Sequence, residues 1–345
     1  MKVSVIVPTY NNEATIAVAL ESIFAQRFQG GFEVIVVNDG STDGTRAVLK
    51  EYGDRIRVVD QQNAGVAAAR NTGIRAASGE YIALLDGDDT WTEDKLEKTV
   101  PVLDRNPGCV AVFSDATIVD EAGTVLWPHH VPAGFDHSPT LDEMLGSRPW
   151  PIMVGSIVMR RDAILAVGGL AEEFGRDYGA EDVFTFLLLR ERGEIIFVPE
   201  NLARWRMPTF GQRLAKCLRP LDWNGKSHGA LPDPDQYFRG YLRFARLILE
   251  RYGARGRKLA DFAFDSTARE EAMLGMMAMH QGDRQYARRC YLSSIRNQPR
   301  KLKTYLRLAW AILPVRVAET LSAMLSPRLR RSLSGPPFIQ EERLL

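Results

Sequence analysis

A regular alternation in the first part of the chain constrains the fold more than any other feature of the sequence. Short runs rich in β-branched residues alternate with stretches whose apolar residues recur at helical spacing. The expected strands are 3–7, 33–37, 56–60 and 80–85, and the expected helices are 13–26, 42–52 and 65–77. Because parallel strands need a crossover connection between them, this alternation predicts an α/β domain with a largely parallel sheet.

The pattern changes after the fourth expected strand. The segment Thr90-Trp-Thr-Glu93 has the spacing of a capping box, so it predicts a helix that begins there. A strand at 110–114 and a hairpin around 120–123 indicate that the sheet becomes mixed. A further strand is expected at 195–199.

From residue 212 onward the strand pattern is absent and the spacing is helical. The expected helices are 237–252, 257–281, 284–297 and 301–313. We therefore predict a catalytic α/β domain over 1–211 and an all-α domain over 212–345. The helix pair within 269–299 has tetratricopeptide character, but a single unit makes no repeat array.

Charge, cysteine content and hydropathy narrow the function classes. Lys and Arg total 44 against 43 Asp and Glu, which removes the whole-protein electrostatic argument for nucleic-acid binding. The three cysteines form no C-x-x-C pair, so neither a zinc ribbon nor a disulfide framework is indicated. No apolar stretch has the length of a signal peptide or of a membrane span. We expect a cytoplasmic protein, either soluble or peripheral on the inner face of the plasma membrane.

Polar residues gather where the expected strands end. The four end segments are Pro8-Thr-Tyr-Asn11, Asn38-Asp-Gly-Ser41, Gln62-Asn-Ala-Gly65 and Asp86-Gly-Asp88. In open parallel sheets, ligands bind at the carboxyl ends of the strands, so these segments predict one shared ligand site.

The residue types in these segments indicate the kind of ligand. No G-x-G-x-x-G follows the first strand, so a dinucleotide site of the usual kind is unsupported. A calcium loop beginning at Asp86 is the alternative, but Trp91 stands where that loop needs glycine. The ligand that remains is a diphosphate, held through a divalent cation that carboxylate oxygens bind.

The segments VSVIVPTYNN, EVIVVNDGSTDGT, QNAGVAAARNTGIRAASGEYIALLDGDD and GAED resemble the family-2 inverting glycosyltransferases of the GT-A fold. The resemblance implies a Rossmann-like nucleotide-diphospho-sugar transferase with a mixed sheet flanked by helices. It also implies metal-dependent transfer of a sugar, with a UDP-sugar the best guess for the donor. The acceptor would be a hydroxyl of a glycan or of a lipid-linked sugar in cell-envelope polysaccharide synthesis.

The resemblance assigns roles on the donor side of the site. Pro8 and Tyr10 would flank the uracil, and Asp39 would accept the imide N–H of the base. Asn63 and Arg70 would complete the pocket for the nucleoside and the phosphates.

The acidic motif D-x-D falls on Asp86 and Asp88. By the same resemblance Asp88 would bind Mn²⁺ or Mg²⁺, while Asp86 would reach the ribose or the metal. Gly87 between them would let the backbone approach the ligand closely, since it has no Cβ. Arg206 would contact the diphosphate.

The pair Glu181-Asp182 matches the acidic motif in which the aspartate is the general base. An acceptor hydroxyl must lose a proton as it attacks the anomeric carbon, and a positioned carboxylate can take it. The alternative is an acidic first turn that favours the helix dipole. Segments 150–161 and 168–170 resemble the acceptor-side strand and turn, with ordinary sheet packing as the alternative.

One departure from the family pattern bears on processivity. Processive members carry Q-x-x-R-W and membrane spans, whereas Asn201 stands here in the position of the glutamine and no span follows. A single-addition enzyme is therefore favoured. His129, His130 and His137 lie in a Pro-rich connection, where we expect loop residues or acceptor contacts rather than metal ligands.

Three questions stay open at the level of sequence. Segment 301–326 mixes basic and apolar residues, which suits contact with a membrane surface, packing within the helical domain or a homo-oligomer contact. A non-catalytic scaffold that binds a sugar nucleotide is a second function class. A nucleotidyltransferase is a third, although its Gly-rich N-terminal loop is missing.

Overall fold

The computed structural model describes residues 1–146, 151–174, 180–207, 239–280, 283–299 and 302–313. The chain divides into two compact units, Met1–Arg213 and Leu214–Leu345. Each unit is described by itself below. The division predicted between residues 211 and 212 lies outside the described residues, and the assignment of catalysis to the first domain stays a prediction.

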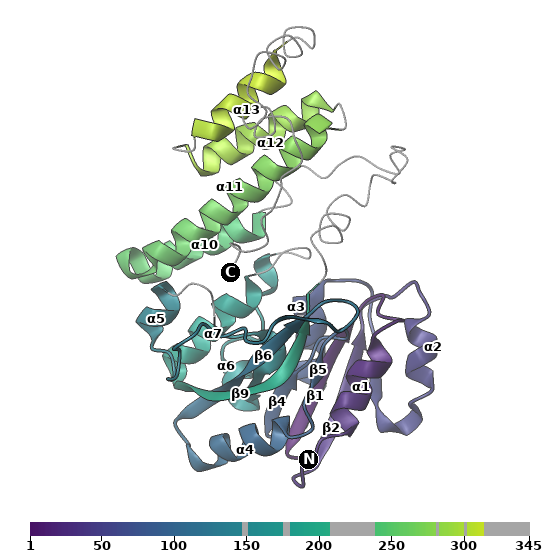
Figure 1. The fold of residues 1–345 in the computed structure, drawn as a ribbon. Coiled ribbons are helices and arrows are strands. Elements are labelled where there is room, and N and C mark those ends of the chain that lie inside the picture. The colour runs from purple at the N-terminus through teal and green to yellow at the C-terminus, as the bar shows by residue number, and fades with distance from the viewer. Residues whose placement is uncertain (147–150, 175–179, 208–238, 281–282, 300–301, 314–345) are drawn as a thin grey trace. The chain divides into compact units, whose positions relative to one another are not determined.

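The first unit is built on one sheet with the strand order β3-β2-β1-β4-β8-β6-β9-β5, and β7 pairs with β6 (Figure 1). Its first half is parallel, as the alternation predicts. These strands are β1 (Val3–Thr9), β2 (Phe32–Asn38), β3 (Arg57–Asp60) and β4 (Tyr81–Leu84).

The second half of the sheet is mixed. Strand β8 (Ile157–Arg160) lies antiparallel between β4 and β6 (Cys109–Val119), and β6 pairs parallel with β9 (Glu194–Arg206). Two short strands complete it, β5 (Thr90–Trp91) on β9 and β7 (Val125–Trp127) on β6. The β6–β9 register shifts on either side of Asp115, and such irregularities often accompany active sites. The predicted mixed sheet and its 120–123 hairpin are confirmed.

Helices cover both faces of this sheet (Figure 1). The alternating residues Val3, Val5 and Val7 of β1 belong to the apolar core shared with α1 and α4. On the opposite face Ile6 packs on α3, so closely that a Cβ on Gly73 would lie 2.2 Å from the Ile6 side chain. The helices are α1 (Ile16–Phe24), α2 (Thr45–Lys50), α3 (Val66–Ala76), α4 (Lys95–Arg105), α5 (Leu141–Gly146), α6 (Arg161–Ala166) and α7 (Glu181–Arg192).

The predicted helix start at Thr90 is wrong. Thr90 and Trp91 form β5, where they pair with Arg204 and Ala203 of β9, and α4 begins at Lys95. The Trp91 side chain is buried and its Nε1–H donates to the Gly155 carbonyl at 2.7 Å. Burying this indole and pairing its backbone with a distant strand outweighs the local capping signal.

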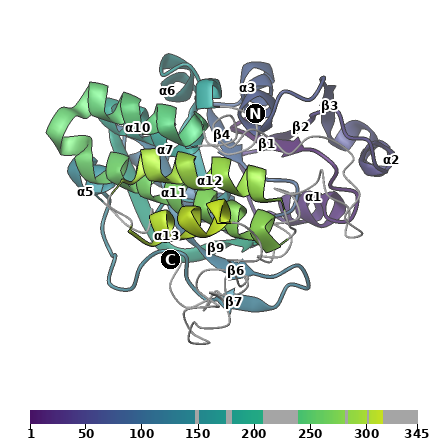
Figure 2. The same cartoon turned by 90° about the horizontal axis from the view of Figure 1, so that it is seen from above.

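The second unit is helical throughout its described residues. Helices α11, α12 and α13 lie side by side (Figure 2). Asp283 caps α12 by accepting the Tyr286 N–H at 2.9 Å. Its helices are α10 (Arg239–Tyr252), α11 (Arg257–His280), α12 (Arg284–Asn297) and α13 (Leu302–Ile312). Within the described residues of this region, the predicted helical structure is confirmed.

A small apolar core that includes Leu274, Ala287, Tyr291 and Ala311 holds α11, α12 and α13 together. None of the described helices is both long enough and apolar enough to cross a membrane. Segment 301–326, for which membrane contact, packing within the helical domain and a homo-oligomer contact were left open, is described only over 302–313.

Candidate active site

The aspartate at the end of β2 organises the donor-side loop. Asp39 is only 3% exposed, and its carboxylate accepts hydrogen bonds from Gln61 Nε2 at 2.7 Å, Ala64 N at 2.8 Å and Gly65 N at 2.9 Å. A carboxylate offers about four acceptor positions, so Asp39 retains capacity for one more donor. Its predicted bond to a base N–H is compatible with this geometry and stays a prediction.

The other predicted nucleoside contacts lie around the same edge. Pro8 is buried at the end of β1, while Tyr10 exposes 43% of its surface in the loop that follows. Asn63 is partly exposed beside Gly40, where a Cβ would lie 2.9 Å from the Asn63 backbone nitrogen. Gly40 has φ +75°, so glycine is needed there for its conformation as well as for space.

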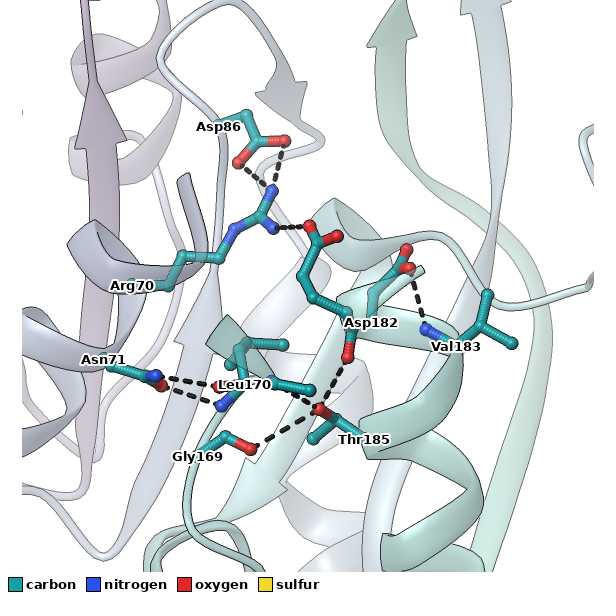
Figure 3. Close-up of polar contacts among 10 residues, drawn as sticks. Arg70, Asn71, Asp86, Gly169, Leu170, Asp182, Val183 and Thr185 are labelled. Atoms are coloured by element: carbon teal, nitrogen blue, oxygen red, sulfur yellow. Dashed lines mark hydrogen bonds and ion pairs between the residues drawn. The ribbon is translucent and has the colours of Figure 1, made fainter. Parts of the chain in front are cut away.

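A buried guanidinium joins the first D-x-D aspartate to the start of α7 (Figure 3). Arg70 Nη2 lies 2.7 Å and 2.9 Å from the two Asp86 carboxylate oxygens, and Arg70 Nη1 lies 3.0 Å from Glu181 Oε1. Burial opposes the charge of Arg70, but Asp86 and Glu181 outweigh it and hold the pKa of Arg70 above its usual value. The structure therefore brings Arg70, Asp86 and the Glu181-Asp182 pair together across 111 residues of sequence.

The base candidate lies in the first turn of α7. Asp182 is partly buried, and its Oδ1 accepts the Val183 N–H at 2.7 Å. Burial first, and then the neighbouring Glu181, raise the pKa of Asp182 to about 7. A general base works best with a pKa near the operating pH, so this environment suits proton transfer. The helix-start interpretation also describes this position, and the two readings are compatible.

Arg206 contacts the D-x-D loop from the end of β9. Its backbone N–H donates to Asp89 Oδ1 at 2.8 Å, and its Nε donates to the Asp88 carbonyl at 3.0 Å. Its Nη1 reaches the carbonyls of Asp120, at 3.2 Å, and Glu121 in the β6–β7 hairpin. Arg206 thus fixes the backbone of the loop that carries Asp88. The diphosphate contact predicted for Arg206 stays a prediction.

Sequence reasoning missed the role of Asp89. This residue is 3% exposed, and burial, followed by the charges of Asp88 and Asp86, raises the pKa of its carboxyl well above the usual value. Three carboxyls on four consecutive residues concentrate negative charge that a divalent cation would offset. Mg²⁺ and Mn²⁺ bind through one or two carboxylates plus substrate phosphates, so Asp86 and Asp88 fit such an ion. Among the described residues no three His, Cys, Asp or Glu side chains form a metal cluster of their own.

Sequence reasoning also missed Asn71, the residue after Arg70. Its Nδ2 donates to the Leu170 carbonyl at 2.8 Å, and its Oδ1 accepts the Leu170 N–H at 2.7 Å (Figure 3). The same Nδ2 donates to Glu172 Oε1 at 2.7 Å. A Cβ on Gly169, which has φ +84°, would lie 2.3 Å from Asn71 Oδ1. Asn71 therefore holds the turn that precedes α7. The signal available in the sequence was an amide side chain in the middle of the expected helix 65–77.

The fold and the site together define a class of protein, the GT-A type of nucleotide-diphospho-sugar transferase. Residues 4–166 match the model of glycosyl transferase family 2. The α/β unit of this chain belongs to glycosyl transferase family 2.

The chain is also similar to curated proteins and to solved structures. The uncharacterized protein Rv1520 of Mycobacterium tuberculosis is 30% identical over 66% of this chain, which spans 65% of that protein's length. The glucosyltransferase WfgD of Escherichia coli is 41% identical over a stretch that makes up 30% of this chain and 42% of the length of WfgD. Its name gives UDP-Glc as donor and alpha-D-GlcNAc-diphosphoundecaprenol as acceptor. Staphylococcus aureus TarS 1–349 with UDP-GlcNAc has a TM-score of 0.55 at 20% identity, covering 92% of this chain and 88% of its own. At that identity TarS supports the fold alone.

Proposed function

We propose that this protein is a metal-dependent inverting glycosyltransferase that moves a hexosyl or N-acetylhexosaminyl group from a UDP-sugar to an acceptor hydroxyl. The observation that carries the proposal is the shared cluster in which Arg70 links Asp86, on the donor side, to the Glu181-Asp182 pair. The pKa of Asp182, raised to about 7, favours an enzyme over a nucleotide-binding scaffold. A scaffold has no use for a general base, whereas catalytic sites commonly contain carboxyls with raised pKa values.

The residues divide the chemistry between them. Asp182 takes the proton of the acceptor hydroxyl as its oxygen attacks the anomeric carbon, and the bond from that carbon to the diphosphate breaks on the opposite face. Asp39 and the loop it orders bind the nucleoside, while Tyr10 is exposed for stacking. A divalent cation held by Asp88 and Asp86, when bound, would stabilise the charge that develops on the leaving diphosphate. Arg206 keeps the backbone of that loop in place.

The names of the relatives, rather than the site, support the choice of acceptor. WfgD acts on a lipid-linked sugar diphosphate, and the Bacillus subtilis relative TuaG is named for teichuronic acid biosynthesis. We infer a glycan or lipid-linked acceptor in cell-envelope polysaccharide synthesis, reached from the cytoplasmic side of the plasma membrane. The C-terminal helices would then contact the membrane surface or a second copy of the chain.

A single substitution tests the proposal. Asp182→Asn keeps the shape of the side chain but cannot take a proton, so transfer should fall by about 10²–10⁴-fold. UDP affinity in Mn²⁺, measured by calorimetry, should be unchanged. Transfer is measured with UDP-glucose and UDP-GlcNAc as donors and a short-chain alkyl α-D-GlcNAc diphosphate as acceptor.

Asp162 provides a matched control. It also lies in the first turn of a helix and also accepts the N–H of the following residue at 2.7 Å, but it is exposed. Asp162→Asn should leave transfer unchanged. Full activity of Asp182→Asn would reject the base assignment and make Glu181 the next candidate, and a wild-type protein that binds UDP but turns over no donor would favour the scaffold.

A further inference from the structure

His129, for which the sequence left a loop residue or an acceptor contact open, is held by a buried carboxylate. Asp115 has a side chain only 9% exposed, and its Oδ2 lies 2.8 Å from Nδ1 of His129. Its Oδ1 accepts three backbone N–H groups, from Ala116 at 2.7 Å, His130 at 3.0 Å and Val131 at 2.9 Å. Oδ1 alone therefore orders the chain that follows β7, and Oδ2 forms the hydrogen bond with the His129 ring.

The strand that carries Asp115 is connected with the D-x-D loop. Ala83 of β4 and Val112 of β6 both pair with Val158 of β8, so β8 alone separates the two strands. Arg206 joins the segments that follow them, because it donates to the Asp88 carbonyl at 3.0 Å and to the Asp120 carbonyl at 3.2 Å. Gly155, just before β8, lies against the same loop, since a Cβ there would lie 3.3 Å from Asp89 Oδ2.

Asp115 also lies on the face of the sheet that carries α7. Phe113, two residues earlier, stacks on Phe197, and Phe135 from the His129 connection packs against the same ring. Arg190 of α7 donates from Nε to the Pro139 carbonyl in that connection at 2.9 Å. The connection and α7 thus cover the same strands, and α7 begins at the Asp182 end of the site.

The carboxylate determines what the exposed side of the ring can do. Beside a carboxylate Nδ1 must carry the proton, so Nε2 of a neutral His129 is a hydrogen-bond acceptor. The His129 side chain is 63% exposed, and within the described part of the chain its ring makes no other hydrogen bond. Asp115 therefore fixes an exposed imidazole whose Nε2 is turned away from the carboxylate.

We propose that His129, positioned by Asp115, is an acceptor-binding residue whose Nε2 accepts a hydrogen bond from a hydroxyl of the acceptor sugar. The proposal rests on the glycosyltransferase function above and extends its site to β6 and the β7–α5 connection. His129 binds the acceptor and takes no part in the proton transfer assigned to Asp182.

The first test separates acceptor binding from donor use. His129→Ala should raise the KM for the alkyl α-D-GlcNAc diphosphate by about 3- to 10-fold, as expected for loss of one hydrogen bond. The KM for the UDP-sugar and its hydrolysis by water should not change. His137→Ala is the matched control, because His137 lies in the same connection, is half exposed and pairs with Glu143 instead.

The second test inverts the polarity of the ring. In Asp115→Asn the amide oxygen can still accept the backbone N–H groups, but the amide nitrogen donates to Nδ1 and moves the ring proton to Nε2. Acceptor KM should rise as in His129→Ala, while ¹⁵N NMR of the ring should report the exchanged tautomer.

The outcomes distinguish the two levels of the proposal. An unchanged acceptor KM in His129→Ala, in a preparation whose wild type transfers sugar, would overturn the role of His129 alone. A loss in His129→Ala that Asp115→Asn does not share would mean that the ring donates, as to an anionic group, and would also overturn the hydroxyl contact. A wild type without UDP-sugar turnover would instead overturn the proposed function.

Discussion

At the scale of single residues, burial gives Asp182 the chemistry that an exposed carboxyl lacks. Its pKa is raised to about 7 by desolvation and by Glu181, so the base loses its charge as the pH falls through that value. Transfer should therefore rise with pH up to about 7 and level off above it, with a slope of about tenfold per unit on the acid side. The measurement is kcat against pH at saturating donor and acceptor. A profile flat down to pH 5 would show that Asp182 is not the group that titrates.

The metal prediction belongs to the same scale. Asp88→Ala should abolish the part of UDP affinity that depends on Mn²⁺, because a hard cation bridging to a diphosphate needs a carboxylate ligand. Calorimetry with and without Mn²⁺ measures it, and circular dichroism checks the fold. Asp136→Ala, which removes a carboxyl whose side chain is 88% exposed, is the control. Equal Mn²⁺ dependence in the Asp88→Ala and wild-type proteins would remove Asp88 from the site.

At the scale of elements, α3 positions α7. Arg70 and Asn71 are consecutive on α3, and they reach the first turn of α7 and the turn before it (Figure 3). Thr185 completes the connection, since its Oγ1 donates to the Glu181 carbonyl at 2.6 Å and accepts the Ala171 N–H at 3.2 Å. The helix that carries the base is therefore held by contacts from distant elements, while the Asp182 side chain itself bonds to the next residue, Val183.

Asn71→Ala should lower kcat more than it raises the KM for the donor, because it loosens α7 while leaving the nucleoside loop intact. It should also cost about 1–3 kcal/mol of unfolding free energy, since it leaves the buried Leu170 backbone groups unpaired. Steady-state kinetics and urea unfolding give the two quantities. Thr72→Ala, one residue further along α3, is the control and should change neither. An effect confined to donor KM would place Asn71 in the nucleotide site instead.

At the scale of the whole molecule, the two units have separate apolar cores. Every predicted site residue lies in the first unit, so only that unit should gain stability from the donor. We expect two transitions in calorimetric melting, of which UDP with Mn²⁺ raises only one. A ligand at 100 times its Kd contributes about 2.7 kcal/mol to the unit that binds it. A single transition, shifted as a whole, would show that the units unfold together.

The local part of the fold could be predicted from the sequence. Runs of β-branched residues located the parallel strands, and helical spacing located the helices, of which α12 lies at the predicted 284–297. Asp39 and Asp86 were found because parallel strands bring their carboxyl ends to one edge, whatever the rest of the chain does. The acidic pair at 181–182 was found through the family motif, and its place at a helix start agrees with helix-end electrostatics.

Contacts between distant segments decided the rest. Only pairing with β9 makes Thr90 and Trp91 a strand, and only the packing of α3 against α7 brings Arg70 between Asp86 and Glu181. Sequence alone assigned no partner to Asp89, Asn71 or Asp115, whose partners on other segments lie 14 to 117 residues away. Sequence spacing determines which residues share a face or an edge of one element. The choice of partner across elements is determined by burial, which makes an unpaired polar group or charge costly and so selects the packing that satisfies it.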